Sequence, residues 1–151
     1  MQKIQSFQID HNVLEPGIYV SRIDGDITTY DLRTRKPNTG IVMDNITMHS
    51  VEHMIATFIR NSTIADRVIY FGPMGCQTGF YLLVRNADNQ EVLAVLKDVL
   101  AKTVAHTGDV FGNSEIECGN CRTLDLAAAQ KECAAYLECL NAKEHSFQYV
   151  A

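Results

Sequence analysis

The chain has 151 residues, enough for one domain with a substantial core and too few for two domains of ordinary size. Its net charge is -5 and no cluster of Lys and Arg stands out, which argues against a surface for nucleic acid or anionic lipid. No apolar run approaches membrane-spanning length, and residues 1–6 do not resemble a signal peptide. We therefore expect a cytoplasmic protein whose five cysteines are thiols, metal ligands or catalytic groups rather than disulfides.

The first third of the chain predicts an antiparallel hairpin. Residues 16–24 and 26–33 have the composition of strands, and the Asp24-Gly25 pair between them is a common tight turn. The Pro, Asn and Gly of residues 35–40 then predict a loop. The polar segment 1–15, which contains His11, has no clear pattern of a regular element.

Residues 46–60 predict an amphipathic helix, for which Asn45 or Thr47 is a possible N-terminal cap. One face of this helix is apolar and faces the predicted core, and it consists of Met48, Val51, Ile55, Phe58 and Ile59.

The same helix carries the pattern His-x-x-Glu-His over residues 49–53. Residues four apart lie one turn above each other, so His49 and His53 can direct two imidazoles at one metal ion. The carboxylate of Glu52 lies at the edge of that face. Two neutral nitrogens beside a carboxylate predict a transition-metal site that has its own acid or base.

A second hairpin is predicted after this helix. Residues 67–71 and 80–85 are short apolar strands, and the turn at 72–79 is rich in glycine and contains Cys76. A turn of this kind can present a thiolate to a pocket. From the local sequence alone, a cysteine that merely fills the turn is an equally good interpretation.

The last part of the chain predicts two helices separated by a loop. An acidic capping box at residues 88–91 opens the first helix, and residues 125–142 form the second. Between them, Ile116 could belong to a last short strand, and Cys118 and Cys121 form a C-x-x-C pair. Because hairpins alternate with helices, we predict a single α+β domain over residues 1–151, a mostly antiparallel sheet covered by helices on one side.

Two histidines need at least one more ligand, and the best candidates are Cys118 and Cys121. If both bind, the site is closed and holds structural zinc; if one binds, an open position remains for water or substrate. The His-x-x-Glu-His pattern also occurs in inverzincin peptidases. However, 151 residues leave little room for a peptidase lobe, and that function would leave Cys76 without a role.

Taken together, these motifs resemble the S-ribosylhomocysteine lyase family, the LuxS family, over nearly the whole chain. The resemblance rests on Ser6-Phe7 with Asp10-His11, on Asp31-Leu32-Arg33 with Pro37-Asn38, on residues 49–53, on the Pro-Met-Gly-Cys run within residues 73–81, and on Cys118-Gly119. Three features differ from many relatives. Residues 69–72 contain no acidic residue, although one is common shortly before Pro-Met-Gly-Cys; Leu124 stands where a histidine is common; and Cys121 is not a usual feature of the family.

The resemblance implies a homodimer with two active sites at the subunit interface. It also implies a divalent metal, Fe²⁺ in the cell, which Zn²⁺ or Co²⁺ can replace. The family's ligands are two histidines and a cysteine followed by glycine, with water as the fourth ligand. The matching residues here are His49, His53 and Cys118.

The resemblance further implies roles for five other residues. Glu52 and Cys76 match the general acid/base pair, and Arg33 matches a substrate-binding residue. Ser6 and His11 match binding residues that reach across from the partner subunit. The implied reaction converts S-ribosylhomocysteine to homocysteine and dihydroxypentanedione by enediolate isomerisations and elimination of the thioether. That second product is the precursor of autoinducer-2, a quorum-sensing signal, and the reaction belongs to the activated methyl cycle.

Overall fold

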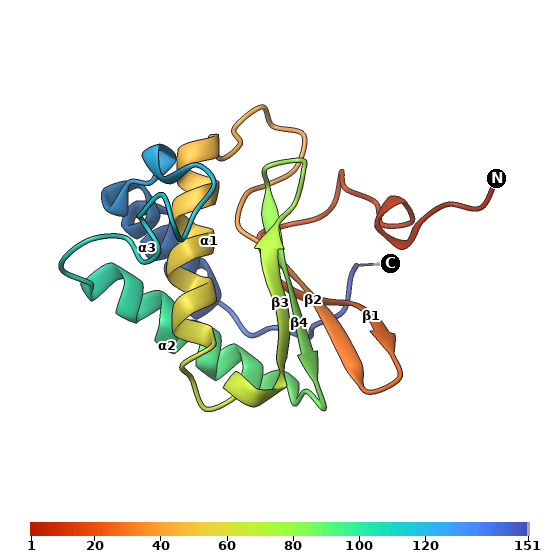
Figure 1. Ribbon diagram of the computed structural model, residues 1–151. Helices are drawn as coiled ribbons and strands as arrows, with labels where there is room; N and C mark the ends of the chain where they lie inside the picture. The colour runs from red at the N-terminus through yellow and green to blue at the C-terminus, as the bar shows by residue number, and fades with distance from the viewer. Residues whose placement is uncertain (151) are drawn as a thin grey trace.

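The computed structural model describes residues 1–150, which fold into a four-stranded sheet and three helices (Figure 1). The strands are β1 (Gly17–Asp24), β2 (Ile27–Arg33), β3 (Val68–Pro73) and β4 (Gly79–Arg85), and the helices are α1 (Asn45–Ile59), α2 (Asn89–Ala105) and α3 (Leu126–Asn141). Three short 3₁₀ turns lie at Gln5–Phe7, Ala65–Arg67 and Cys121–Thr123. None of the helices within residues 1–150 combines the length and the apolar character that crossing a bilayer requires.

The strands lie in the order β1-β2-β4-β3, and all neighbours are antiparallel. Both predicted hairpins are therefore present, and they join through the pairing of β2 with β4. At one end of this central pair Arg33 lies opposite Gly79. A Cβ atom on Gly79 would be 2.6 Å from the carbonyl oxygen of Leu32, so this close approach requires glycine. The consequence is that Arg33 lies beside the turn between β3 and β4.

The three helices cover one face of the sheet, while the N-terminal segment lies on the other side (Figure 1). Side chains alternate between the two faces of a strand. On β2, Tyr30 and Leu32 are buried in the core that the sheet forms with the helices. The residues between and after them, Asp31 and Arg33, share the opposite face and are nevertheless buried. This arrangement confirms the predicted α+β fold.

Two local predictions were wrong. The cap of α1 is Asp44, whose carboxylate accepts a hydrogen bond from the backbone N–H of Thr47 at 2.7 Å, and not Asn45 or Thr47. Ile116 lies in a turn with its side chain 98% exposed, and it belongs to no strand of the described chain. The additional partner of the sheet is the C-terminal segment, where Phe147 forms a bridge beside Tyr19 of β1.

Candidate functional site

Helix α1 and the loop before α3 bring together three residues that could bind a metal. One donor atom from each of His49, His53 and Cys118 lies within 4.8 Å of the other two. The Nε2 atom of His49 is 3.3 Å from the Cys118 sulfur. The two imidazole rings are 4.5 Å apart because their residues are one helical turn apart, as the sequence predicts.

The orientation of the His49 ring is set by Thr123. The Thr123 hydroxyl donates its hydrogen to the carbonyl oxygen of Asn120, at 3.1 Å. Its oxygen is therefore free to accept a hydrogen bond from Nδ1 of His49, at 2.8 Å. With the proton on Nδ1, the Nε2 atom that faces Cys118 carries a lone pair, which is the form that binds a metal.

The ring of His53 is held in the same way by a backbone oxygen. Its Nδ1 donates to the carbonyl of Phe111 at 2.7 Å, which leaves Nε2 free. The chain can pass this close because the next residue is Gly112, with a φ of +68°. A Cβ atom there would be only 3.2 Å from Nδ1 of His53.

These three side chains fit a divalent transition metal. Two imidazole nitrogens and one thiolate are ligands that Zn²⁺, Fe²⁺ and Co²⁺ accept, and three protein ligands leave a position for water or substrate. Cys121 is not part of the group, so the closed site with four protein ligands is not formed. Glu52 lies on the same helix and is half-buried.

A second group of predicted residues lines a cavity of about 430 Å³. Four of the residues that sequence analysis selected are in its wall, namely Ser6, His11, Arg33 and Cys76. The others are Phe7, Pro73, Met74, Gly75 and Tyr81. The wall thus combines the N-terminal segment, the end of β2, and the turn between β3 and β4. Its size suits a small molecule.

Arg33 is the charged residue at the base of this cavity, and only 2% of it is exposed. Its Nη1 donates to the hydroxyl of Thr78 at 2.8 Å and lies 3.8 Å from the sulfur of Cys76. Its other two nitrogens bind both carboxylate oxygens of Asp31. Burial lowers the pKa of Arg33, but the charge and hydrogen bonds of Asp31, together with Cys76 and Tyr149, outweigh burial and leave that pKa raised. A fixed positive charge therefore faces the thiol of Cys76.

The turn that carries Cys76 is tied to the residues just before α1. The backbone N–H of Met43 donates to the carbonyl of Gln77 at 3.0 Å, and the Gln77 side chain donates to the carbonyl of Met43 at 2.8 Å. The cavity and the metal-binding group nevertheless share no lining residue.

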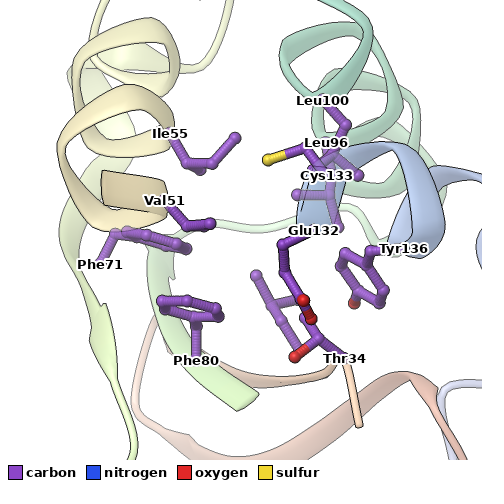
Figure 2. A pocket seen from close by; sticks show the side chains of 11 residues that line it. Thr34, Val51, Ile55, Phe71, Phe80, Leu96, Leu100, Glu132, Cys133 and Tyr136 are labelled. Carbon is purple, nitrogen blue, oxygen red and sulfur yellow. The ribbon is translucent and has the colours of Figure 1, made fainter. Parts of the chain in front are cut away.

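A third hollow, in the core between the sheet and the helices, has a different character. It measures about 10 Å³, too small for a substrate, and it is lined mainly by apolar side chains. Figure 2 shows the sulfur of Cys133 pointing toward Ile55 of α1 across this hollow. Burial raises the pKa of the Cys133 thiol to about 12, so it stays protonated and unreactive. Cys133 is a core residue.

Sequence analysis did not identify the residues that hold the site residues in place. Asp31 could have been found, because residues two apart on a strand share a face and Arg33 is two residues away. Thr123 and the Phe111 carbonyl had no comparable signal, because each reaches its histidine only through the fold of a loop.

Comparison with known proteins gives one family. A family model described as S-ribosylhomocysteinase (LuxS) matches residues 4–147. The S-ribosylhomocysteine lyase of Desulfotalea psychrophila is 46% identical, over 90% of this chain and 89% of the relative. The S-ribosylhomocysteine lyase of Borreliella afzelii is 40% identical over 99% of both chains, and that of Finegoldia magna is 42% identical over 93% of both. With its two histidines and one cysteine converging as the motifs predict, the chain belongs to the S-ribosylhomocysteine lyase (LuxS) family.

Proposed function

We propose that this protein cleaves S-ribosylhomocysteine to homocysteine and dihydroxypentanedione, the precursor of autoinducer-2. The observation that carries the proposal is the convergence of His49, His53 and Cys118 in a chain that belongs to this family. Three ligands leave the metal an open position, as a reaction at the metal requires.

The reaction moves a sugar carbonyl along the carbon chain and then eliminates the thioether. Each move requires a proton to be taken from a carbon beside the carbonyl and returned one carbon away. A divalent metal bound by His49, His53 and Cys118 supplies a Lewis acid that stabilises negative charge on the substrate oxygens. The metal is Fe²⁺ in the cell, and Zn²⁺ or Co²⁺ can replace it.

The protein residues supply the proton transfers and the binding. Cys76 exchanges protons with carbon as a thiolate, a form that the neighbouring guanidinium of Arg33 favours. Glu52 moves protons between the substrate oxygens and assists the elimination. Ser6, His11 and Arg33 bind the substrate, and their position in the wall of one cavity supports this role.

The test is the release of free thiol from S-ribosylhomocysteine by protein purified without oxygen and loaded with Fe²⁺ or Co²⁺. We expect metal-dependent release, and we expect Cys118→Ala to lose both metal and activity. Cys121→Ala is the matched control and should keep both. A fully metallated protein that releases no thiol would refute the proposed function.

The roles of Cys76 and Glu52 have a separate test. Cys76→Ala and Glu52→Gln should retain the metal and lose at least about a hundredfold in rate, the usual size of a general acid–base effect. Metal content and turnover should be measured on the same sample. Turnover close to that of the unaltered protein in either variant would remove that residue from the mechanism.

We further propose a cytoplasmic homodimer in which Ser6 and His11 of one subunit complete the metal site of the other. Two observations support this. The cavity lined by Ser6 and His11 shares no residue with the metal-binding group. The N-terminal segment also exposes large apolar side chains, Ile4 at 59% and Phe7 at 69%, which a partner could cover.

Mixing two inactive variants tests this arrangement. His11→Ala and His53→Ala should each be inactive alone. After subunit exchange, half the dimers carry one chain of each kind, and one of their two sites has no substitution. An equal mixture should then recover about a quarter of full activity. An active monomer, or a mixture without recovery, would contradict the proposed dimer.

A further inference from the structure

The side chain of Tyr149, close to the C-terminus, lies on the face of the sheet opposite the three helices. Its ring stacks on that of Tyr19 in β1, with centroids 5.0 Å apart and planes 12° apart. Tyr19 is the cross-strand neighbour of Asp31 in β2. The stack therefore places the Tyr149 hydroxyl over Asp31, and it donates a hydrogen bond of 2.7 Å to the carboxylate.

Asp31 connects this hydroxyl to the cavity. Its Oδ2 atom accepts from both Tyr149 and Nη2 of Arg33, the latter at 2.6 Å, while Oδ1 accepts from Nε of Arg33 at 3.1 Å. With two of its nitrogens held, the planar guanidinium can direct only Nη1 toward Thr78 and Cys76. The contacts form one chain from Tyr149 through Asp31 and Arg33 to the Cys76 sulfur.

We propose that Tyr149 is a positioning residue for the reaction: its hydrogen bond to Asp31 sets how strongly that carboxylate neutralises Arg33, and so how strongly Arg33 favours the thiolate of Cys76. The role of Cys76 rests on the proposed function. A donated hydrogen bond withdraws negative charge from the carboxylate, which leaves more of the guanidinium charge to act on the sulfur.

The surroundings of the pair support this direction. The charged or titratable groups around Arg33 and Cys76 are Asp31, Tyr149, Tyr81, His11, Tyr19 and Tyr136, and burial raises the pKa of Tyr19 and of Tyr136, so both stay neutral. Burial, and then Asp31, raise the pKa of Tyr149, so its hydroxyl keeps its proton and remains a donor. Tyr81 is likewise kept neutral, since burial and the Asp31 charge raise its pKa. Asp31 is the group whose charge opposes Arg33.

The experiment compares Tyr149→Phe with Tyr19→Phe. Both variants keep the aromatic stack and lose one hydroxyl. The hydroxyl of Tyr19 donates to the carbonyl of Glu15 and not to Asp31, so Tyr19→Phe is the matched control. The readout is the rate of iodoacetamide alkylation of Cys76 in metal-loaded protein, followed over pH by mass spectrometry of the tryptic peptide 68–85, in which Cys76 is the only cysteine.

In Tyr149→Phe we expect alkylation of Cys76 near pH 7 to be slower by about threefold. The variant loses one hydrogen bond to a charged group, and only part of that effect reaches the Cys76 sulfur through Arg33. The whole rate profile should move to higher pH, while Tyr19→Phe should match the unaltered protein. An unchanged profile in Tyr149→Phe, or equal slowing in both variants, would overturn the proposal. Alkylation needs no turnover, so it can be measured even in a protein that releases no thiol from S-ribosylhomocysteine. In that case a shifted alkylation profile in Tyr149→Phe would support the link from Tyr149 to Cys76, and only the proposed function would be refuted.

Discussion

Single residues outside the motifs fix the chemistry of the metal-binding group. The His-x-x-Glu-His spacing predicts that His49 and His53 point the same way, and both do. Which nitrogen each ring offers depends instead on two oxygens, the Thr123 hydroxyl and the Phe111 carbonyl. We therefore expect metal affinity to depend on loop residues that are not themselves ligands.

Replacement of Thr123 by Val tests this dependence. The variant removes the acceptor for Nδ1 of His49, so the ring loses its fixed tautomer and orientation. We expect metal affinity to fall by about ten- to a hundredfold, the usual effect of losing such a partner. Competition with a chelator measures it. Thr123→Ser keeps the hydroxyl and should bind metal normally; if Val and Ser variants bind equally well, the hydroxyl has no such role.

Helix α1 carries two of the three residues of the metal-binding group, His49 and His53. Its first turn is capped by Asp44, whose carboxylate binds the backbone N–H of Thr47. Asp44→Ala should lower the free energy of unfolding by about 1 kcal/mol, the typical value for a lost cap. Asn45→Ala should change it by less than about 0.5 kcal/mol, as for other surface positions. Urea denaturation at fixed protein and metal concentration measures both, and an equal loss would contradict the assignment of the cap.

Local sequence patterns predict most of the helices and strands, but they do not predict how these elements are arranged. Alternation of side chains and the turn residues predict both hairpins, and apolar periodicity predicts all three helices. The pairing of β2 with β4 and the path of the C-terminal segment depend on contacts between distant residues, which no local pattern encodes. Ile116 shows the opposite error, because one β-branched residue without a paired neighbour is no evidence of a strand.

In the candidate site, too, local sequence predicts some features, and others depend on contacts between distant residues. His49 and His53 lie on a helix whose local sequence indicates their chemistry, whereas the local sequence around Cys76 fits a reactive thiolate and a turn filler equally well. The partnership of Arg33 with Cys76 could not be predicted from the residues alone, because it arises where β2 ends beside the turn after β3. The contribution of Tyr149 is still less accessible, since it comes from a segment with no regular structure.

At the scale of the whole molecule, buried acids with raised pKa values make the fold sensitive to alkaline pH. Burial raises the pKa of Cys133 from 9.0 to about 12, and burial followed by the charge of Asp88 raises that of Tyr30 from 10.0 to about 12. Both groups lose their protons at lower pH when the chain is unfolded than when it is folded. Between about pH 9 and pH 12 the folded state therefore binds more protons than the unfolded state, and the free energy of unfolding falls as pH rises.

The variant Cys133→Val measures how much the Cys133 thiol contributes to this fall in the free energy of unfolding. Valine cannot ionise, and the hollow beside the sulfur gives its second methyl group room. For the unaltered protein, ionisation of Cys133 in the unfolded chain should remove about 2 kcal/mol between pH 9 and pH 10.5, at 1.36 kcal/mol per pKa unit. Urea unfolding at several pH values, with protein and metal concentration held fixed, measures the fall in the free energy of unfolding over this pH range. That fall should be smaller in the variant by about 2 kcal/mol. Equal slopes in the two proteins would mean that the thiol of Cys133 ionises in the folded state almost as easily as in the unfolded chain.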